Sequence, residues 1–142
     1  MNPVYDNDNI FAKILRGDLP CIKVYEDEHT LAFMDIMPQR EGHTLVIPKE
    51  PAVTLYQLSP EAALACMKTV QKVGPAVQKA TGYEGSSIFQ LNGEAAGQTV
   101  PHIHFHILPG SVLNIDALKG HAAEMADPED LKAIAAKIIA EL

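Results

Sequence analysis

The amino-acid sequence predicts an α+β fold with a mainly antiparallel five-stranded sheet, one long helix and several short helices. Short runs rich in β-branched and aromatic residues, bounded by turn residues, predict the strands. One long segment carries its apolar residues at helical spacing, which predicts the long helix. The strands are grouped before and after that helix, whereas a strict alternation of strand and helix would favour a parallel sheet.

The first predicted elements are a short helix and three strands. Apolar residues at positions 10, 11, 14 and 15 fall on one side of a helix, and Gly17 is a typical helix end ahead of Pro20. Acidic and proline-containing turns then separate three strand-like runs, which are residues 22–25, 30–35 and 44–47. This spacing predicts an antiparallel meander.

The long helix has a clear start signal. Ser59 is a typical N-cap, Pro60 suits the first helical position, and apolar residues keep the helical spacing as far as Val73. Proline lacks the N–H that an interior helical residue must donate. We therefore expect Gly74-Pro75 to kink or break this helix.

The remaining elements are two strands and a closing helix. Strand patterns return at residues 87–91 and in a last strand that ends at 109–110, with a small, polar loop over 92–99 between them. Asp127-Pro128 opens the closing helix, whose acidic first turn suits the positive end of the helix dipole. Its apolar residues lie on one face, and they are Leu131, Ile134, Ala135, Ile138 and Ile139.

The composition indicates a single globular domain. Of the 142 residues, 47% are hydrophobic and 20% are charged. A chain of this length can bury about 68 to 70% of its unfolded surface without a disulfide or a structural metal. The net charge of −7 opposes attraction to nucleic acid polymers and anionic membranes, so neither is expected as a partner. No signal-peptide pattern is present and Cys21 and Cys66 lie in unlike contexts, so we expect a cytoplasmic protein.

The most informative motif is a strict alternation of histidines with apolar residues. Successive side chains of a strand point to opposite faces, so His102, His104 and His106 would share one face. The other face would carry the core residues Ile103, Phe105 and Ile107. Neighbouring histidines would lie about 6.6 Å apart at the backbone, so one metal ion could bind two of them but hardly three. Because imidazoles can act as nucleophiles, bases and phosphate donors, the row suits phosphoryl chemistry without a metal.

The loop just before this strand has the features of an anion site. It contains two glycines, Gly93 and Gly97, where the backbone can approach a ligand closely. Asn92, Gln98 and Thr99 add side-chain donors, and consecutive N–H groups in such a loop can form an anion-binding nest. We expect a phosphate group to bind there.

With Gly97-Gln98-Thr99 ahead of it, the histidine strand resembles the histidine triad (HIT) superfamily of nucleotide hydrolases and transferases. Further segments are similar to the Hint-like branch and its bacterial members, namely Ile10-Phe11-x-x-Ile14, Val24-Tyr25-Glu26-Asp27, Leu31-Ala32-Phe33-Met34-Asp35-Ile36, Pro38-Gln39 and Gly42-His43-Thr44-Leu45-Val46-Ile47-Pro48-Lys49. The resemblance covers about residues 9–110 of a single HIT-like domain spanning residues 1–142. Residues 111–142 form a helical extension without a clear counterpart.

The resemblance implies a hydrolase that cleaves purine nucleoside phosphoramidates of the AMP-amine type through a nucleotidyl-histidine intermediate. It implies His104 as the nucleophile, His106 beside the phosphate and leaving group, His102 in support and His43 as a fourth imidazole. It also implies a homodimer and a reaction that needs no metal and no cofactor.

The resemblance further implies a nucleotide-binding set. Asp35 matches the residue that holds the ribose hydroxyls, a task suited to a carboxylate. The residues that match the walls around the base are Ile10, Phe11, Ile14, Phe33, Ile36 and Leu45. The residues that match the phosphate and leaving-group side are Asn92, Gly97, Gln98 and Thr99.

Departures from the family pattern and alternative functions stay open at this point. Asn9 and Ala12 stand where many relatives have a cysteine pair for structural zinc, so zinc is not expected. The runner-up substrate is a dinucleoside polyphosphate. A nucleotide-binding regulatory module with little turnover and a metal site at His102 and His104 are further alternatives. His29 and His121 lie in polar or mixed segments, and we expect both on the surface.

Overall fold

The computed structural model describes residues 3–115 and 120–142, and its elements confirm the predicted fold class. The helices are α1 (Ile10–Leu15), α2 (Pro60–Thr81) and α3 (Pro128–Ala140), with 3₁₀ turns η1 (Glu94–Ala96) and η2 (Val112–Asn114). The strands are β1 (Lys23–Glu26), β2 (Thr30–Met34), β3 (Thr44–Pro48), β4 (Ser86–Phe89) and β5 (Phe105–Pro109). Among the described residues, no helix is long and apolar enough to cross a membrane.

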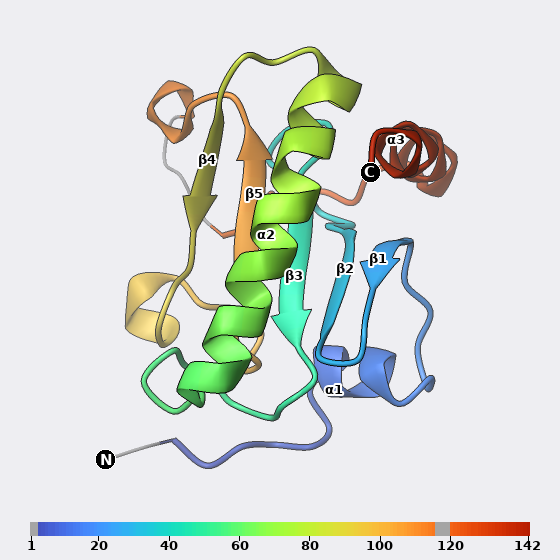
Figure 1. Ribbon diagram of the computed structural model, residues 1–142. Helices are drawn as coiled ribbons and strands as arrows, with labels where there is room; N and C mark the ends of the chain where they lie inside the picture. Colours follow the sequence, from blue (N-terminus) through green and yellow to red (C-terminus); the bar gives the residue numbers. More distant parts are fainter. Residues whose placement is uncertain (1–2, 116–119) are drawn as a thin grey trace.

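The five strands form one antiparallel sheet in the order β1-β2-β3-β5-β4. The predicted meander of the first three strands is confirmed, and β5 inserts between β3 and β4 (Figure 1). In the register, Leu45 of β3 and Phe89 of β4 both pair with His106 of β5. Side chains of three strands are therefore brought together around one histidine.

The two faces of the sheet carry different clusters. Helix α2 runs across one face, with α3 beside it (Figure 1), and the core there includes Ile103, Phe105 and Ile107. The opposite face carries a smaller cluster around Phe11 of α1, made of Phe11, Leu31, Phe33, Leu45 and Ile47. We call these the α2 side and the α1 side. Alternate residues of β2, β3 and β5 divide between them, as predicted for the histidine strand.

The start of α2 is capped twice. Ser59 Oγ accepts a hydrogen bond from the N–H of Ala62 at 3.1 Å, which satisfies one free donor of the first turn. Glu50 in turn accepts from the Ser59 N–H at 2.8 Å and from its hydroxyl at 2.9 Å. The carboxylate of Glu50 therefore fixes the loop that leads from β3 into α2.

The expected break at Gly74-Pro75 is wrong, because α2 continues to Thr81 as one helix. Pro75 and Gln71 are exposed, so the Gln71 carbonyl that loses its partner at Pro75 faces water. Val73 and Val77, on either side of the proline, are fully buried in the α2-side core. Packing of these flanking residues outweighs the local cost of the proline.

The histidine strand is shorter than predicted, because β5 begins only at Phe105. The Ile103 N–H donates to the carbonyl of Ala52, beyond the end of β3, at 2.9 Å. The Pro48 carbonyl accepts from the His102 ring instead of a main-chain N–H. His102 and His104 thus precede the ladder. The predicted alternation of faces still holds, since Ile103 is buried in the α2-side core.

Candidate active site

The predicted histidines gather on the α1 side of the sheet. His43 directly precedes β3, His106 lies on β5, and His102 and His104 directly precede β5. All four side chains are buried, with His104 the most exposed at 4%. The ring centroids of His104 and His106 are 4.8 Å apart, and those of His43 and His106 are 5.2 Å apart. The structure therefore assembles the imidazole cluster that the alternation predicts.

The hydrogen bonds of His43 and His106 fix the positions of their protons. The Gln39 N–H donates to Nδ1 of His43 at 3.1 Å, so a neutral His43 carries its proton on Nε2. This Nε2 lies 2.9 Å from Nδ1 of His106 and donates to it. A neutral His106 then carries its proton on Nε2, which is buried without a partner among the described residues. That N–H is available to an acceptor such as a phosphate oxygen.

His102 and His104 are fixed in the same way. His102 donates from Nε2 to the Pro48 carbonyl at 2.9 Å, and its Nδ1 accepts from the Tyr5 hydroxyl at 2.6 Å. His104 donates from Nδ1 to the His102 carbonyl at 2.8 Å. The lone pair of a neutral His104 is therefore on Nε2. Sequence reasoning missed Tyr5, because no periodicity or motif links it to a histidine 97 positions away.

Burial keeps these imidazoles neutral. It lowers the pKa of His43 to about 4 and the pKa of His104 to about 4. Burial and then the neighbouring imidazoles lower the pKa of His106, and burial lowers that of His102. At neutral pH, His104 therefore presents an unprotonated ring nitrogen, which is the form that a nucleophile needs.

Asp35 is the carboxylate of the site. It lies at the end of β2, is 3% exposed, and accepts from the Met37 N–H at 2.9 Å. Nδ1 of His43 is 3.5 Å from its Oδ2. Burial pulls the pKa of Asp35 upward, but the hydrogen bond from His121 and the electrostatic interactions with the neighbouring His43 and His121 rings outweigh it and lower the pKa. Asp35 is therefore ionised at neutral pH.

His121 is not a surface residue, which corrects the sequence expectation. Its Nδ1 is 2.5 Å from Oδ2 of Asp35, and its side chain is only 13% exposed. Its ring stacks on His104 at 5.4 Å and on His43 at 6.2 Å between centroids. His29, by contrast, has a side chain that is 67% exposed, in line with the expected surface position.

The chain segment before α3 brings His121 into the site. In Figure 1 this segment passes behind the sheet, on the side away from α2. The Ala122 N–H donates to the Met37 carbonyl at 2.8 Å, and the Ala126 N–H donates to the Ile36 carbonyl at 2.9 Å. These main-chain bonds hold the segment against the end of β2. No sequence pattern signals such a contact, since irregular segments pair without periodicity.

The residues predicted to line the base form two groups. Phe11, Phe33 and Leu45 are buried in the α1-side cluster, with Ile14 packed against it. The Phe11 ring meets His104 edge-on at 5.0 Å. Ile10 and Ile36 are instead exposed, at 53% and 47%. The predicted wall thus has a buried part in contact with His104 and an exposed rim.

The loop before the histidines is held by its own polar side chains. Gln98 donates from Nε2 to the carbonyls of Val53 and Val100 and accepts from the Gly93 N–H at 2.7 Å. Asn92 accepts from the N–H of Leu55 at 2.9 Å. Through these contacts Gln98 holds the loop in place. The other predicted phosphate-side residues are Gly97, which adopts a φ of +102°, and the exposed Thr99.

The position of the family's cysteine pair does not fit zinc in this chain. Asn9 caps α1 by accepting from the Ala12 N–H at 2.9 Å, and its amide donates to the Asp6 carbonyl at 2.7 Å. Both polar ends of the Asn9 side chain are thus engaged, and Ala12 offers no ligand atom. A hydrogen-bonded cap replaces the metal ligands here.

Comparisons with known proteins identify a family for this chain. The HIT domain model matches residues 16–112. Adenosine 5'-monophosphoramidase hnt1 of Schizosaccharomyces pombe is 40% identical over 133 residues, covering 94% of this chain and 97% of that protein. Protein hit of Bacillus subtilis is 42% identical over 135 residues, covering 94% of this chain and 93% of that protein.

Solved structures share the whole fold. The crystal structure of a Hit-like protein involved in cell-cycle regulation from Bartonella henselae superimposes with a TM-score of 0.88 at 44% identity, covering 99% of this chain and all of that one. A zinc-bound histidine triad family protein from Mycobacterium smegmatis gives a TM-score of 0.79 at 36% identity, covering 94% of this chain and 92% of that one. The chain therefore belongs to the histidine triad (HIT) family.

Proposed function

We propose that this protein hydrolyses purine nucleoside phosphoramidates of the AMP-amine type, using His104 as the nucleophile and no metal ion. The observation that carries the proposal is the fixed ring of His104, whose Nδ1 donates to the His102 carbonyl and whose Nε2 lone pair is left free. The adenosine 5'-monophosphoramidases of Schizosaccharomyces pombe and Saccharomyces cerevisiae, 40% and 31% identical to this chain, support the substrate class.

The proposed reaction has two displacements at the α-phosphorus. Nε2 of His104 attacks and expels the amine, which gives a nucleotidyl-histidine intermediate. Water then attacks that intermediate and releases AMP. The buried Nε2–H of His106 supplies a donor for the phosphoryl oxygens as charge develops on them. Because this donor is already in place, the charge is stabilised without reorganisation and without a cation.

The proposed nucleotide site combines a carboxylate with apolar walls. Asp35 accepts from Met37 and His121, and an ionised carboxylate has about four acceptor positions, so it can still accept from a ribose hydroxyl. The base would pack between the exposed rim of Ile10 and Ile36 and the buried Phe11. Main-chain groups around Gly97, together with the exposed Thr99, complete the phosphate side.

Hydrolysis of adenosine 5'-phosphoramidate in excess EDTA tests this function, with AMP release measured for wild type and for His104→Ala. We expect release by wild type and none above background by the variant. His29→Ala, which removes an exposed imidazole, should match wild type. Loss of activity in EDTA would refute metal independence. AMP binding without turnover would favour a regulatory module, and a preference for diadenosine tetraphosphate would favour the polyphosphate alternative.

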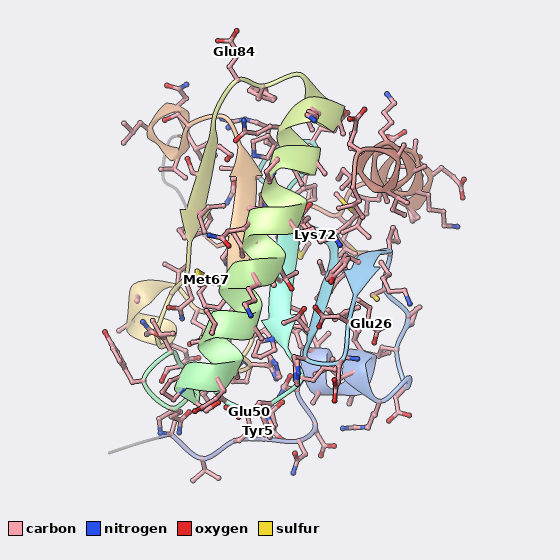
Figure 2. The ribbon with its side chains drawn as sticks, in the orientation of Figure 1. Tyr5, Glu26, Glu50, Met67, Lys72 and Glu84 are labelled. Atoms are coloured by element: carbon pink, nitrogen blue, oxygen red, sulfur yellow. The ribbon has the colours of Figure 1, made fainter. Side chains whose placement is uncertain are left out.

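We also propose that the protein is a homodimer that pairs through β4. This strand is at the edge of the sheet, and Ile88 on it is 45% exposed. Met67 and Leu64 of α2 are also exposed, and Figure 2 shows Met67 on the side of α2 that faces β4. An apolar patch beside an unpaired edge suits self-association. A mass of twice 15.4 kDa by light scattering would support it, and a monomer would not.

A further inference from the structure

His121 has the surroundings of a catalytic imidazole, although it lies outside the segment that the family model matches. Its Nδ1 is tied to Asp35, and its Nε2 is buried without a partner among the described residues. Its ring centroid is 5.4 Å from that of His104 and 5.2 Å from that of His106. A buried polar atom without a partner costs free energy, so this nitrogen is suited to hydrogen-bond to a bound substrate.

The proposed reaction needs a proton donor for the leaving amine, and His104, His43 and His106 do not supply it. An amine leaves phosphorus readily only when its nitrogen is protonated as the bond breaks. The lone pair of His104 is used for attack. His43 donates its proton to His106, and the proton of His106 faces the phosphoryl oxygens. Burial lowers the pKa of all three, so none of them carries a second proton at neutral pH.

We propose that His121, held by Asp35, is the general acid that protonates the departing amine. This inference rests on the proposed function and extends it by assigning the proton. Among the five imidazoles described in the site, His121 is the one hydrogen-bonded to a carboxylate. Asp35 orients the ring through Nδ1 and balances the charge of its protonated form, as carboxylates do for catalytic histidines. Nε2–H is then the proton that can be given away.

Each step balances. The Nε2 lone pair of His104 forms a bond to phosphorus as the phosphorus–nitrogen bond breaks, and that electron pair stays with the amine nitrogen. The nitrogen takes the proton from Nε2 of His121, and a neutral amine departs. Water then attacks phosphorus and gives its proton to Nε2 of His121 as the bond to His104 breaks. AMP leaves, and both histidines return to their starting states.

The distances allow this transfer. One ring nitrogen of each of His104, His106 and His121 lies within 4.8 Å of the others. A nucleophile about 3 to 3.5 Å from phosphorus places the leaving nitrogen one bond beyond it. A donor must come within about 2.6 to 3.2 Å of that nitrogen. A ring nitrogen of His121 within 4.8 Å of one of His104 is close enough to meet both limits when it lies beside the line of attack.

A pair of substrates separates acid catalysis from other roles of His121. Adenosine 5'-phosphoramidate needs a proton on its leaving group, whereas the p-nitrophenyl ester of AMP releases a stable anion. His121→Asn retains an N–H that can bond to Asp35 but has no proton to give, and His121→Ala serves as a second variant. We expect kcat/KM, which reports the first displacement alone, to fall about 100-fold more for the amide than for the ester in both variants. His29→Ala should behave as wild type.

The outcomes separate this inference from the function on which it rests. Equal losses on both substrates, rescue of the amide reaction by His121→Asn, or faster turnover without His121 would each overturn the acid role and leave the proposed function intact. A wild-type protein that cleaves the ester but not the amide would overturn the proposed substrate, and the role of His121 with it.

Discussion

Gly42 offers a sharp test of how the site is anchored to the long helix. Its backbone has a φ of +93°, and a Cβ added there would lie 2.5 Å from Cγ2 of Thr81, near the end of α2. The neighbouring His43 donates its N–H to Arg40 and accepts from the Asp35 N–H through its carbonyl. The substitution Gly42→Ala therefore perturbs the turn that sets both a histidine and the carboxylate of the site.

The expected loss of stability combines two costs and one gain. A side chain at positive φ costs about 1 to 2 kcal/mol. Forcing a methyl group against Thr81 costs a further amount of about 1 to 3 kcal/mol. Alanine also lowers the conformational entropy of the unfolded chain, which stabilises the folded protein by about 0.4 to 1 kcal/mol. We expect the free energy of unfolding of Gly42→Ala to fall by about 2 to 4 kcal/mol, and Tm to fall by about 5 to 15 °C.

Urea unfolding followed by circular dichroism measures this change, and the chain supplies two matched controls. Gly17 has a φ of +84° with nothing within 4 Å of an added Cβ, so Gly17→Ala isolates the backbone cost. Thr81→Ser removes Cγ2 but keeps the hydroxyl that donates to Val77, so it should partly rescue Gly42→Ala. Equal effects at Gly17 and Gly42, or no rescue, would refute the contact with α2.

Two further predictions concern the imidazole network. Tyr5→Phe removes the donor to Nδ1 of His102 and should lower kcat about tenfold with KM within about twofold, while Tyr56→Phe, at an 81% exposed side chain, should change neither. A rise in KM alone would place Tyr5 in substrate binding. Acid should destabilise the fold. The pKa of His43 and that of His104 are each about 4 in the folded protein and about 6.5 in the unfolded chain. The unfolded chain therefore binds more protons than the folded protein as the pH falls below 6.5. The free energy of unfolding in EDTA should be constant above pH 7 and lower by about 2 kcal/mol per ring at pH 5, and a flat profile would contradict the buried neutral rings.

The sequence predicted those parts of the site that follow a periodic pattern. The alternation from His102 to Ile107 divides histidines from core residues as expected, although the hydrogen-bonded ladder starts only at Phe105. The ladder starts late because the Ile103 N–H donates to the carbonyl of Ala52 in the loop after β3. Pro75 shows the opposite case, in which tertiary packing on both sides overrides a local helix-breaking signal.

The parts that were missed come from irregular segments. Tyr5 precedes the first helix and His121 precedes the last. Tyr5 is hydrogen-bonded to His102 and His121 to Asp35, each through one side-chain bond. A contact of this kind leaves no period in the sequence, and His121 follows a glycine in a mixed segment that resembles a surface loop. The motifs predicted which residues could bind a ligand, but the hydrogen-bond partners that fix the protons of the imidazoles are brought near only by the fold.

The alternation of histidines and apolar residues from His102 to Ile107 places residues in both the α2-side core and the site. Ile103 and Ile107 are fully buried beneath α2, and their burial forces His102, His104 and His106 to the α1 side. There the carbonyls of His102 and Pro48, which cannot change protonation state, fix which ring nitrogen of His104 and His102 carries the proton. The backbone therefore selects the tautomer that leaves Nε2 of His104 free. In the proposed reaction, His104 therefore depends on the apolar core for its position and on a main-chain acceptor for its reactive tautomer.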